Sequence, residues 1–495
     1  MKMFFLTARR IRQAIARKRR KVERTPRGYV IFCKNGYTQR NVSYFKASKL
    51  FLYAAIFCVI FVTSSTLFPF IVGKYVVFRT AVDLALITFL LGVIFRKHEW
   101  ESLASRARRV FRHPLFIAVS VFVFFFLLAS FFAYDPHAAF WSNFERGEGG
   151  LQMLHLYVFF LLLLLLFRTD EEWRKIFIAS LFAAGGVILY GVALLLHIKG
   201  FIGPSDICAR FQGSLGNPAY FAAYSMFLLF FSLWLWFSKK DGTKQRNGAY
   251  LFLVLVIGFL FFLSQTRGAF LGLGLAVIAA LVYLAFSFPS GKQKRLFSIL
   301  AIISIVLAIA AFMFRHENIP LVPFCNSSSR LLDFSVTEQS AQTRLWTWGS
   351  AIKGWKERPL LGWGPENFGV VFDKYFDTRH FIPNQNSETW FDRAHSVFFD
   401  YLVETGVLGF LSFLAIYVVF FVELFRNRRE FITRSPRGIL LSALLFAMPI
   451  AYLGQGVAMF DVLPIYLNVF LFLSFATHIF LKARDAKSPV RNQKQ

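Results

Sequence analysis

The sequence predicts an all-α membrane protein that crosses the bilayer many times, and its composition and its long apolar runs both indicate this class. Of its 495 residues, 56% are hydrophobic and only 17% are charged, and the mean hydropathy is +0.53. Soluble domains carry about 25% charged residues. Phenylalanine alone fills 65 positions. This composition excludes a soluble enzyme, a disordered protein and a small secreted domain held by disulfides.

About twelve apolar segments are long enough to span a membrane, which requires about 20 predominantly apolar residues. The segments at 249–265 and 268–288 are separated only by a short polar stretch. Together they are too long for one helix, so we predict two spans that meet at a polar turn over 264–268. The twelve expected spans are 50–69, 75–95, 114–134, 150–167, 176–197, 218–238, 249–265, 268–288, 296–314, 396–425, 438–458 and 463–481.

The distribution of basic residues predicts the orientation of these spans. A net charge of +29 would suggest nucleic-acid binding in a soluble chain. In a membrane protein, Lys and Arg instead collect in short cytoplasmic loops. Placing both ends of the chain in the cytoplasm puts most of the 56 Lys and Arg there, so we expect no nucleic-acid partner. The predicted regions are a basic tail that contacts anionic lipid (1–49), nine spans (50–314), a large external loop (315–395), three spans (396–481) and a second tail (482–495).

The large external loop is expected to contain two short amphipathic helices. The first covers 343–355 and the second begins near residue 368, where aromatic residues recur at helical spacing. Helices with aromatic faces are typical of elements that lie at a membrane surface. The predicted face of the first helix consists of Arg344, Trp348, Ile352 and Trp355.

Several single charges fall at the external ends of spans or on this loop, in otherwise apolar surroundings. Charges within a membrane protein are costly, and this makes each of them a candidate functional residue. Arginines that converge on one side can bind phosphate oxygens bidentately. The alternative for any one of them is an arginine that extends to the membrane surface. The residues concerned are Arg146, Arg210, Arg267, Arg344 and His395.

The cysteines suggest no metal site, because none of them forms a CxxC motif or a cluster with histidine. Cys58 lies in an apolar run and is expected to serve packing. Cys208 and Cys325 fall in predicted external segments, where a disulfide between them is possible.

Five stretches resemble, in order, motifs of the O-antigen ligase and O-antigen polymerase family. The resemblance covers roughly residues 135–415, and the ordered set is more specific than any single motif. Ser396 follows the histidine where the family usually has Asn. The stretches are FERGEGG at 144–150, RFQG with GNP between 210 and 218, SQTRGA at 264–269, RLWTW with PLLGWG between 344 and 364, and AHS with ETGVLG between 394 and 409.

This resemblance implies a GT-C-like helical membrane fold and transfer of a glycan from an undecaprenyl-diphosphate carrier on the outer face of the inner membrane. It implies that Arg267 and Arg344 bind the diphosphate, with weaker contributions from Arg210 and Arg146. His395 is the candidate general base, and Asp392 could orient its ring.

Trp348 is a further candidate for substrate binding. Fixed arginines can take the place of a divalent metal beside a diphosphate, so we expect no metal and no cofactor. Membrane lipids, the lipid-linked donor and an acceptor are the expected partners.

The acceptor remains open at this level. A ligase would use a glycolipid, a polymerase a growing glycan and an O-oligosaccharyltransferase a protein. A transporter or flippase of lipid-linked sugar is the alternative from another class, and a non-catalytic envelope scaffold is a third.

Overall fold

The computed structural model confirms an all-α membrane protein throughout the part of the chain that it describes. Three predictions lie outside that part: the structure of most of the basic tail, the first section of the external loop and the pairing of Cys208 with Cys325. The described residues are 44–95, 97–143, 146–206, 209–238, 244–289, 291–313, 339–381, 389–432 and 436–487.

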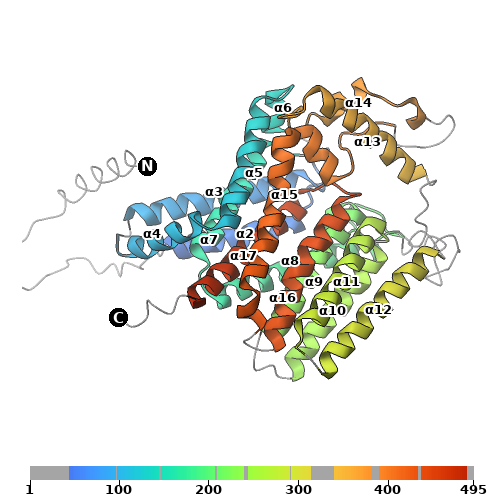
Figure 1. The fold of residues 1–495 in the computed structure, drawn as a ribbon. Coiled ribbons are helices and arrows are strands. Elements are labelled where there is room, and N and C mark those ends of the chain that lie inside the picture. Colours follow the sequence, from blue (N-terminus) through green and yellow to red (C-terminus); the bar gives the residue numbers. More distant parts are fainter. Residues whose placement is uncertain are drawn as a thin grey trace, which may run out of the picture.

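The helices of the first half lie at the left and in the centre of the bundle (Figure 1). They are α2 (Tyr44–Ile56), η1 (Phe57–Ile60), α3 (Val72–Phe95), α4 (Lys97–Phe111), α5 (Pro114–Phe131), α6 (Pro136–Trp141), α7 (Gly150–Leu166), α8 (Asp170–Leu195), η2 (Gly213–Leu215) and α9 (Pro218–Ser238).

The second half contains the remaining spans and the two helices of the external loop. They are α10 (Lys244–Leu263), α11 (Arg267–Ser287), α12 (Lys292–Met313), α13 (Gln339–Glu357), α14 (Phe368–Lys374), η4 (Thr378–His380), α15 (Val397–Ile432), α16 (Pro436–Gly456) and α17 (Leu463–Lys487). In Figure 1, α13 and α14 lie at the top right of the bundle, whereas α4 lies at its left.

Nine of the described helices are long and apolar enough to cross a membrane, and two shorter apolar helices, Gly150–Leu166 and Asn247–Leu263, accompany them. The predicted division at 264–268 is confirmed, because α10 ends at Leu263 and α11 begins at Arg267. The first predicted span is wrong in extent, since its helical part ends at Ile60. A turn follows in which the Thr66 hydroxyl donates to the Thr63 carbonyl at 2.8 Å. Ser and Thr side chains that bond locally in this way compete with helix formation.

The external loop has a small hydrophobic core of its own, and this corrects the expected orientation of its helices. Both predicted helices are present as α13 and α14. However, Ile352 is 38% exposed, and α13 instead buries its neighbours Thr347, Ser350 and Ala351. The aromatic face of α14 is buried with residues of the loop and of α15, and so the prediction that it lies on a membrane surface is wrong. The core consists of Ala351, Trp363, Phe368, Val371, Phe372, Phe391, Ala394 and Val403.

A break within α15 fastens the loop to the membrane bundle. Gly406 has a φ of 62° in the middle of the helix, a conformation that glycine adopts without steric cost. The segment 359–364 runs along this break, and there Trp363 N donates to the Val403 carbonyl at 2.8 Å and Val407 N donates to the Pro359 carbonyl at 2.8 Å. A Cβ on Gly406 would lie 2.3 Å from the carbonyl carbon of Leu360. The close backbone contact therefore requires glycine at this position.

Candidate active site

His395 lies two residues before α15, in a left-handed backbone conformation with a φ of 56°. Its ring packs edge-on against Phe391 and Phe460, with centroids 5.1 Å away in each case. The ring Nδ1 is 3.1 Å from the Arg393 carbonyl oxygen. Because a carbonyl oxygen only accepts, we assign the ring proton to Nδ1. Nε2 then carries a lone pair and is able to accept a proton.

The surroundings of His395 favour its neutral form. The pKa of His395 is lowered to about 4, mainly by burial and to a smaller extent by the positive charges of Arg344 and Arg146. The hydrogen bond to the Arg393 carbonyl and the charge of Asp392 act in the opposite direction, with less effect. The imidazole is therefore unprotonated at neutral pH, as a general base requires.

Arg146 forms a bidentate pair with Asp392. Its Nε and Nη2 lie 2.6 and 2.9 Å from the two carboxylate oxygens, and its Nη1 donates to the Tyr220 hydroxyl at 3.1 Å. Although burial opposes ionisation, these bonds hold the pKa of Asp392 below its ordinary value. Asp392 thus fixes Arg146, and the expectation that it orients the ring of His395 is wrong. The Arg393 carbonyl has that role.

The external helix α13 brings Arg344 close to His395. Trp348, one turn after Arg344, donates from its indole nitrogen to the Ala394 carbonyl at 2.9 Å. The same indole stacks on Phe399 of α15 with a centroid distance of 4.9 Å. These contacts anchor the helix directly beside the histidine, and Arg344 is near enough for its charge to act on the imidazole.

Arg210 binds the turn between α10 and α11, which Arg267 directly follows. Arg210 donates from Nε to the Ser264 carbonyl and from Nη2 to the Thr266 hydroxyl, both at 2.9 Å. Gln265, at the centre of this turn, has a left-handed φ of 47°. Arg210 therefore stabilises the turn from which α11 begins, and Arg267 is the first residue of that helix.

The segment at the end of α16 connects these two groups of residues. On one side, a Cβ on Gly268 would lie 3.4 Å from the Cβ of Ala458. On the other side, Val397 N donates to the Met459 carbonyl at 2.9 Å. The next residue, Phe460, contacts the ring of His395 and lies 5.1 Å below the guanidinium of Arg146. The backbone segment 455–460 thus lies between the start of α11 and His395, in contact with both.

Sequence reasoning missed a buried charge cluster directly beneath His395. Arg393 donates from Nη1 to Glu404 Oε1 at 2.6 Å, and its Nη2 contacts Glu366 and, at 3.5 Å, Glu148. The Arg393 side chain is only 7% exposed. One Oε of Glu148 also accepts a hydrogen bond from Leu463 N at 3.0 Å. Arg393 therefore joins the start of α7, the external loop and α15 around the segment that carries His395.

Three glutamates, Glu148, Glu366 and Glu404, surround the guanidinium of Arg393 in this cluster. Burial raises the pKa of Glu148 to about 8, against the attraction of Arg393. Glu148 and Glu404 both lie within the motif stretches of the sequence, and this was the only signal for them. Arg393 lies between Asp392 and Ala394, and no spacing rule distinguishes it from an ordinary surface charge.

Comparison of the chain with known proteins finds a matching family model and a similar curated protein. A family model described as O-antigen ligase matches residues 251–414, which extend from α10 into α15 and contain Arg267, Arg344 and His395. The curated O-antigen ligase of Pseudomonas aeruginosa is 25% identical to the chain over 345 residues, which cover 69% of this chain and 72% of that protein. The matched segment contains the broken helix, the external helix α13 and the candidate base described above. Over these residues the chain is similar to O-antigen ligases, and the two matches support a protein of that family.

Proposed function

We propose that this protein transfers a glycan from an undecaprenyl-diphosphate carrier to an acceptor hydroxyl, in the synthesis of cell-surface polysaccharide. The observation that carries the proposal is the neutral His395 with its free Nε2 lone pair, held beside Arg344 and Arg146. A base and a set of cations are the two requirements of this reaction.

In this reaction the acceptor oxygen attacks the anomeric carbon of the donor sugar. Nε2 of His395 takes the proton of the acceptor hydroxyl as the new C–O bond forms. The bond between the sugar and the diphosphate breaks, and the lipid diphosphate leaves with the bonding electrons. Arg267 and Arg344 stabilise the negative charge that develops on the diphosphate, because guanidinium groups bind phosphate oxygens in pairs.

Arg146 and Arg210 have supporting parts in this scheme. Arg146 shares its charge with Asp392, and this weakens its contribution to the diphosphate. Arg210 positions the turn that precedes Arg267. Trp348 holds α13 against the segment that carries His395 and presents an aromatic surface near the site.

We place the reaction on the outer face of the bacterial inner membrane. The proposal rests on the basic residues of the sequence, which are concentrated in the loops at the opposite end of the bundle. Among the possible acceptors we favour a glycolipid, as in a ligase, because the curated relative is an O-antigen ligase. A repeat-unit polymerase or an O-oligosaccharyltransferase would use the same donor chemistry with another acceptor.

The test is an assay of the purified protein with a lipid-diphosphate-linked glycan and a defined acceptor. We expect a new glycosidic bond to form in the presence of EDTA, since the arginines supply the positive charge. Arg267→Lys and Arg344→Lys should each reduce turnover strongly, because lysine keeps the charge but loses the bidentate contact.

Arg379→Lys is the matched control, since Arg379 is exposed on the same loop and pairs with Asp377. Full turnover in either active-site variant would remove that arginine from the proposed site. Activity that is lost in EDTA and restored by Mg²⁺ would contradict the metal-independent mechanism. Movement of intact donor across a membrane, with no new bond formed, would support the transporter alternative.

A further inference from the structure

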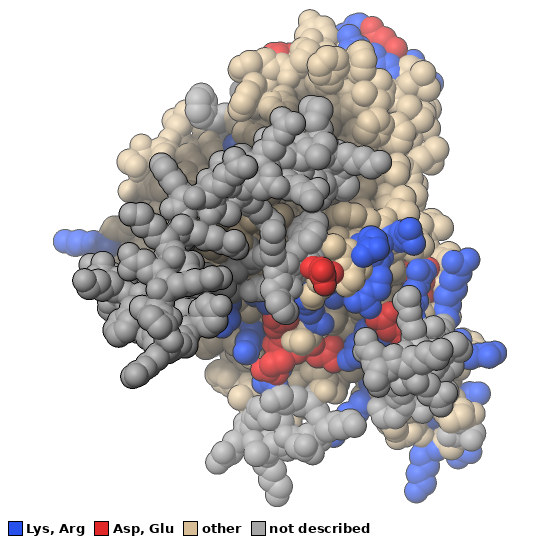
Figure 2. All heavy atoms as spheres, turned by 90° about the vertical axis from the view of Figure 1, so that its left-hand side faces the viewer, with Lys and Arg blue, Asp and Glu red and all other residues tan. Residues whose placement is uncertain are grey.

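A polar cavity lies at the end of the bundle opposite the candidate active site, where α7 and α17 end. It has a volume of about 540 Å³, within the range of about 300–1,000 Å³ that is usual for ligand sites. Figure 2 shows the face that lies at the left in Figure 1. Lys and Arg side chains gather over the lower part of this face, with Asp and Glu among them. We call this space the basal cavity. Its lysine, arginine and hydroxyl-bearing residues are Ser102, Ser105, Arg106, Arg109, Arg168, Thr169 and Lys482.

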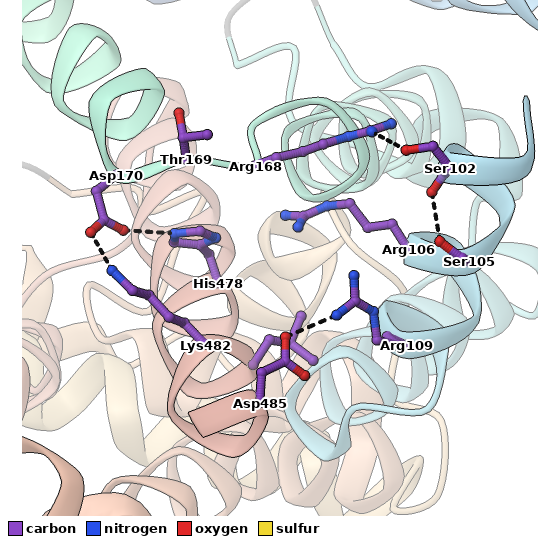
Figure 3. A pocket seen from close by; sticks show the side chains of 11 residues that line it. Ser102, Ser105, Arg106, Arg109, Arg168, Thr169, Asp170, His478, Lys482 and Asp485 are labelled. Atoms are coloured by element: carbon purple, nitrogen blue, oxygen red, sulfur yellow. Dashed lines mark hydrogen bonds and ion pairs between the residues drawn. The ribbon is translucent and has the colours of Figure 1, made fainter. Parts of the chain in front are cut away.

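Two of the basic side chains already have carboxylate partners. Arg109 donates to Asp485 at 2.8 Å, and Lys482 pairs with Asp170, which also lies 3.3 Å from Nε2 of His478 (Figure 3). These pairs lie at the rim of the basal cavity, and each of the four side chains is more than half exposed. They leave two further arginines to account for.

The hydrogen bonds of Arg106 and Arg168 go to uncharged groups. Arg106 donates to the Leu164 and Phe167 carbonyls at 2.6 and 2.8 Å. Arg168 donates to the Ser102 hydroxyl at 2.7 Å and weakly to a carbonyl at the end of α7. In Figure 3, the guanidinium of Arg106 extends into the space between Arg168 and Arg109.

The three guanidinium groups are close enough to repel one another. The pKa of Arg106 is lowered to about 10, mainly by burial and then by the charges of Arg168 and Arg109, whereas Glu172 and Asp485 act in the opposite direction. Arg106, at the centre of this group, is only 9% exposed. A buried excess of positive charge is costly without a counter-ion. An anion in the basal cavity would relieve this repulsion.

The position of the basal cavity indicates which anion it binds. It opens where the apolar helix α7 ends, and its wall includes α4, a short amphipathic helix that buries Leu103 and Val110 and exposes Arg108. Leu481 adds an apolar side chain to the polar lining. Basic pockets between helix ends at the membrane surface are suited to the head groups of anionic lipids.

We propose that the basal cavity binds the phosphate group of an anionic glycerophospholipid, through Arg106, Arg168 and the hydroxyl of Ser102 or Ser105. The lipid would join α4, the α7–α8 connection and the end of α17. This inference is independent of the proposed transfer reaction, because the basal cavity and His395 lie at opposite ends of α7 and α17.

The test measures lipid binding to the purified full-length protein by native mass spectrometry, with titrated dioleoylphosphatidylglycerol as the probe. Arg168→Gln together with Arg109→Gln removes two charges from the basal cavity and spares Arg106, whose bonds hold the end of α7. We expect binding of the first lipid to weaken by at least about tenfold in this double variant. Arg108→Gln, on the exposed face of the same helix, is the control and should bind like the wild type.

Three outcomes would overturn the proposal. Equal binding of the lipid to the wild type and to the double variant would exclude the basal cavity as the site. Equal binding of dioleoylphosphatidylcholine would exclude selection by net charge. If inorganic phosphate raised the midpoint of thermal unfolding as much as the phospholipid did at the same concentration, the ligand would be free phosphate and not a lipid. A larger shift with the phospholipid, lost in the double variant, would support the proposal.

Discussion

His395 is prepared for proton transfer by neighbours that act on its ring in different ways. Phe391 and Phe460 enclose it edge-on and keep water away. The Arg393 carbonyl fixes the proton at Nδ1. Arg344 and Arg146 disfavour a second proton by their charge. The first effect is the largest, and all of them leave Nε2 ready to accept a proton.

The pH dependence of turnover tests this environment. The pKa of His395 is lowered to about 4, mainly by burial, whereas an exposed imidazole has a pKa of about 6.5. Protonated His395 is inactive as a base, so kcat/KM should fall only as the pH approaches about 4 from above. Arg344→Gln removes a neighbouring positive charge, so in this variant the acid limb should move to higher pH.

Arg379→Gln, on the exposed surface of the same loop, should leave the limb in place. An acid limb near pH 6.5 in the wild type would show that the imidazole is solvated. A limb that Arg344→Gln does not move would show that Arg344 does not act on the histidine.

Glu148 makes a separate prediction about stability. Burial raises the pKa of Glu148 to about 8 from an ordinary value of 4.5. The folded state therefore retains a proton that the unfolded chain has released, and stability should decline as the pH rises from about 4.5 to about 8. Glu148→Gln can still accept from Leu463 N and has no proton to lose.

This variant should show a smaller decline in the midpoint of thermal unfolding between about pH 5 and about pH 9. Some decline should remain, because burial also raises the pKa of Asp461 to about 7. Glu171→Gln, at an exposed position on α8, is the control. An unchanged pH dependence in Glu148→Gln would show that Glu148 is ionised in the native protein.

The sequence singled out candidate site residues but not their partners. Arg146, Arg344 and His395 were recognisable because each is a single charge in apolar surroundings. The pairing of Arg146 with Asp392 joins residues 246 positions apart, and no local pattern encodes it. Arg393 was missed for the same reason, since its partners come from three separate segments.

At the scale of elements, the break in α15 holds the external loop against the bundle. Periodicity predicted a helix from residue 396 onward, and α15 is present from Val397. The break at Gly406 could not be inferred from periodicity, because the apolar pattern continues through it. The prediction for the buried face of α13 was also wrong, since the small residue Gly354 lies against Val371 of α14, where a Cβ would be only 2.2 Å from Val371 Cγ1.

Gly406→Ala should destabilise the protein strongly. Its Cβ would lie 2.3 Å from the Leu360 backbone, and its φ of 62° is unfavourable for alanine. Gly349→Ala is the matched control, because Gly349 lies within α13 with open space around it. Alanine there should be neutral or stabilise by about 0.5–1 kcal/mol. Thermal unfolding of both variants in detergent gives the comparison, and equal midpoints would contradict the close contact described for the break.

At the scale of the whole molecule, the bundle separates the candidate active site from the basal cavity. The helix α7 extends from one end to the other, and its 17 residues cover a distance of about 25 Å at the usual helical rise. The number and order of the spans were largely predictable, because apolar runs and basic loops are local features. The packing of α11 on α16, of α13 on α15 and of α15 on α16 was not, because it depends on contacts between distant segments.

Labelling of introduced cysteines tests which end faces outward. Thr378, on the external loop, and Glu171, beside the basal cavity, are both exposed. In intact cells an impermeant thiol reagent should modify Thr378→Cys, and it should modify Glu171→Cys only after the cells are permeabilised. The opposite pattern would contradict the proposed orientation.

The transfer rate of His395→Ala is the most direct test of the central claim. Purified wild type, His395→Ala and His137→Ala are compared with one lipid-linked donor and one acceptor; His137 is an exposed histidine on α6. Donor binding and thermal stability of His395→Ala should be close to those of the wild type. Its rate should be lower by roughly 10² to 10⁴ at every acceptor concentration, because positioned proton transfer is worth about that much. His137→Ala should retain the wild-type rate. Undiminished transfer by a folded His395→Ala protein would contradict the assignment of His395 as the general base.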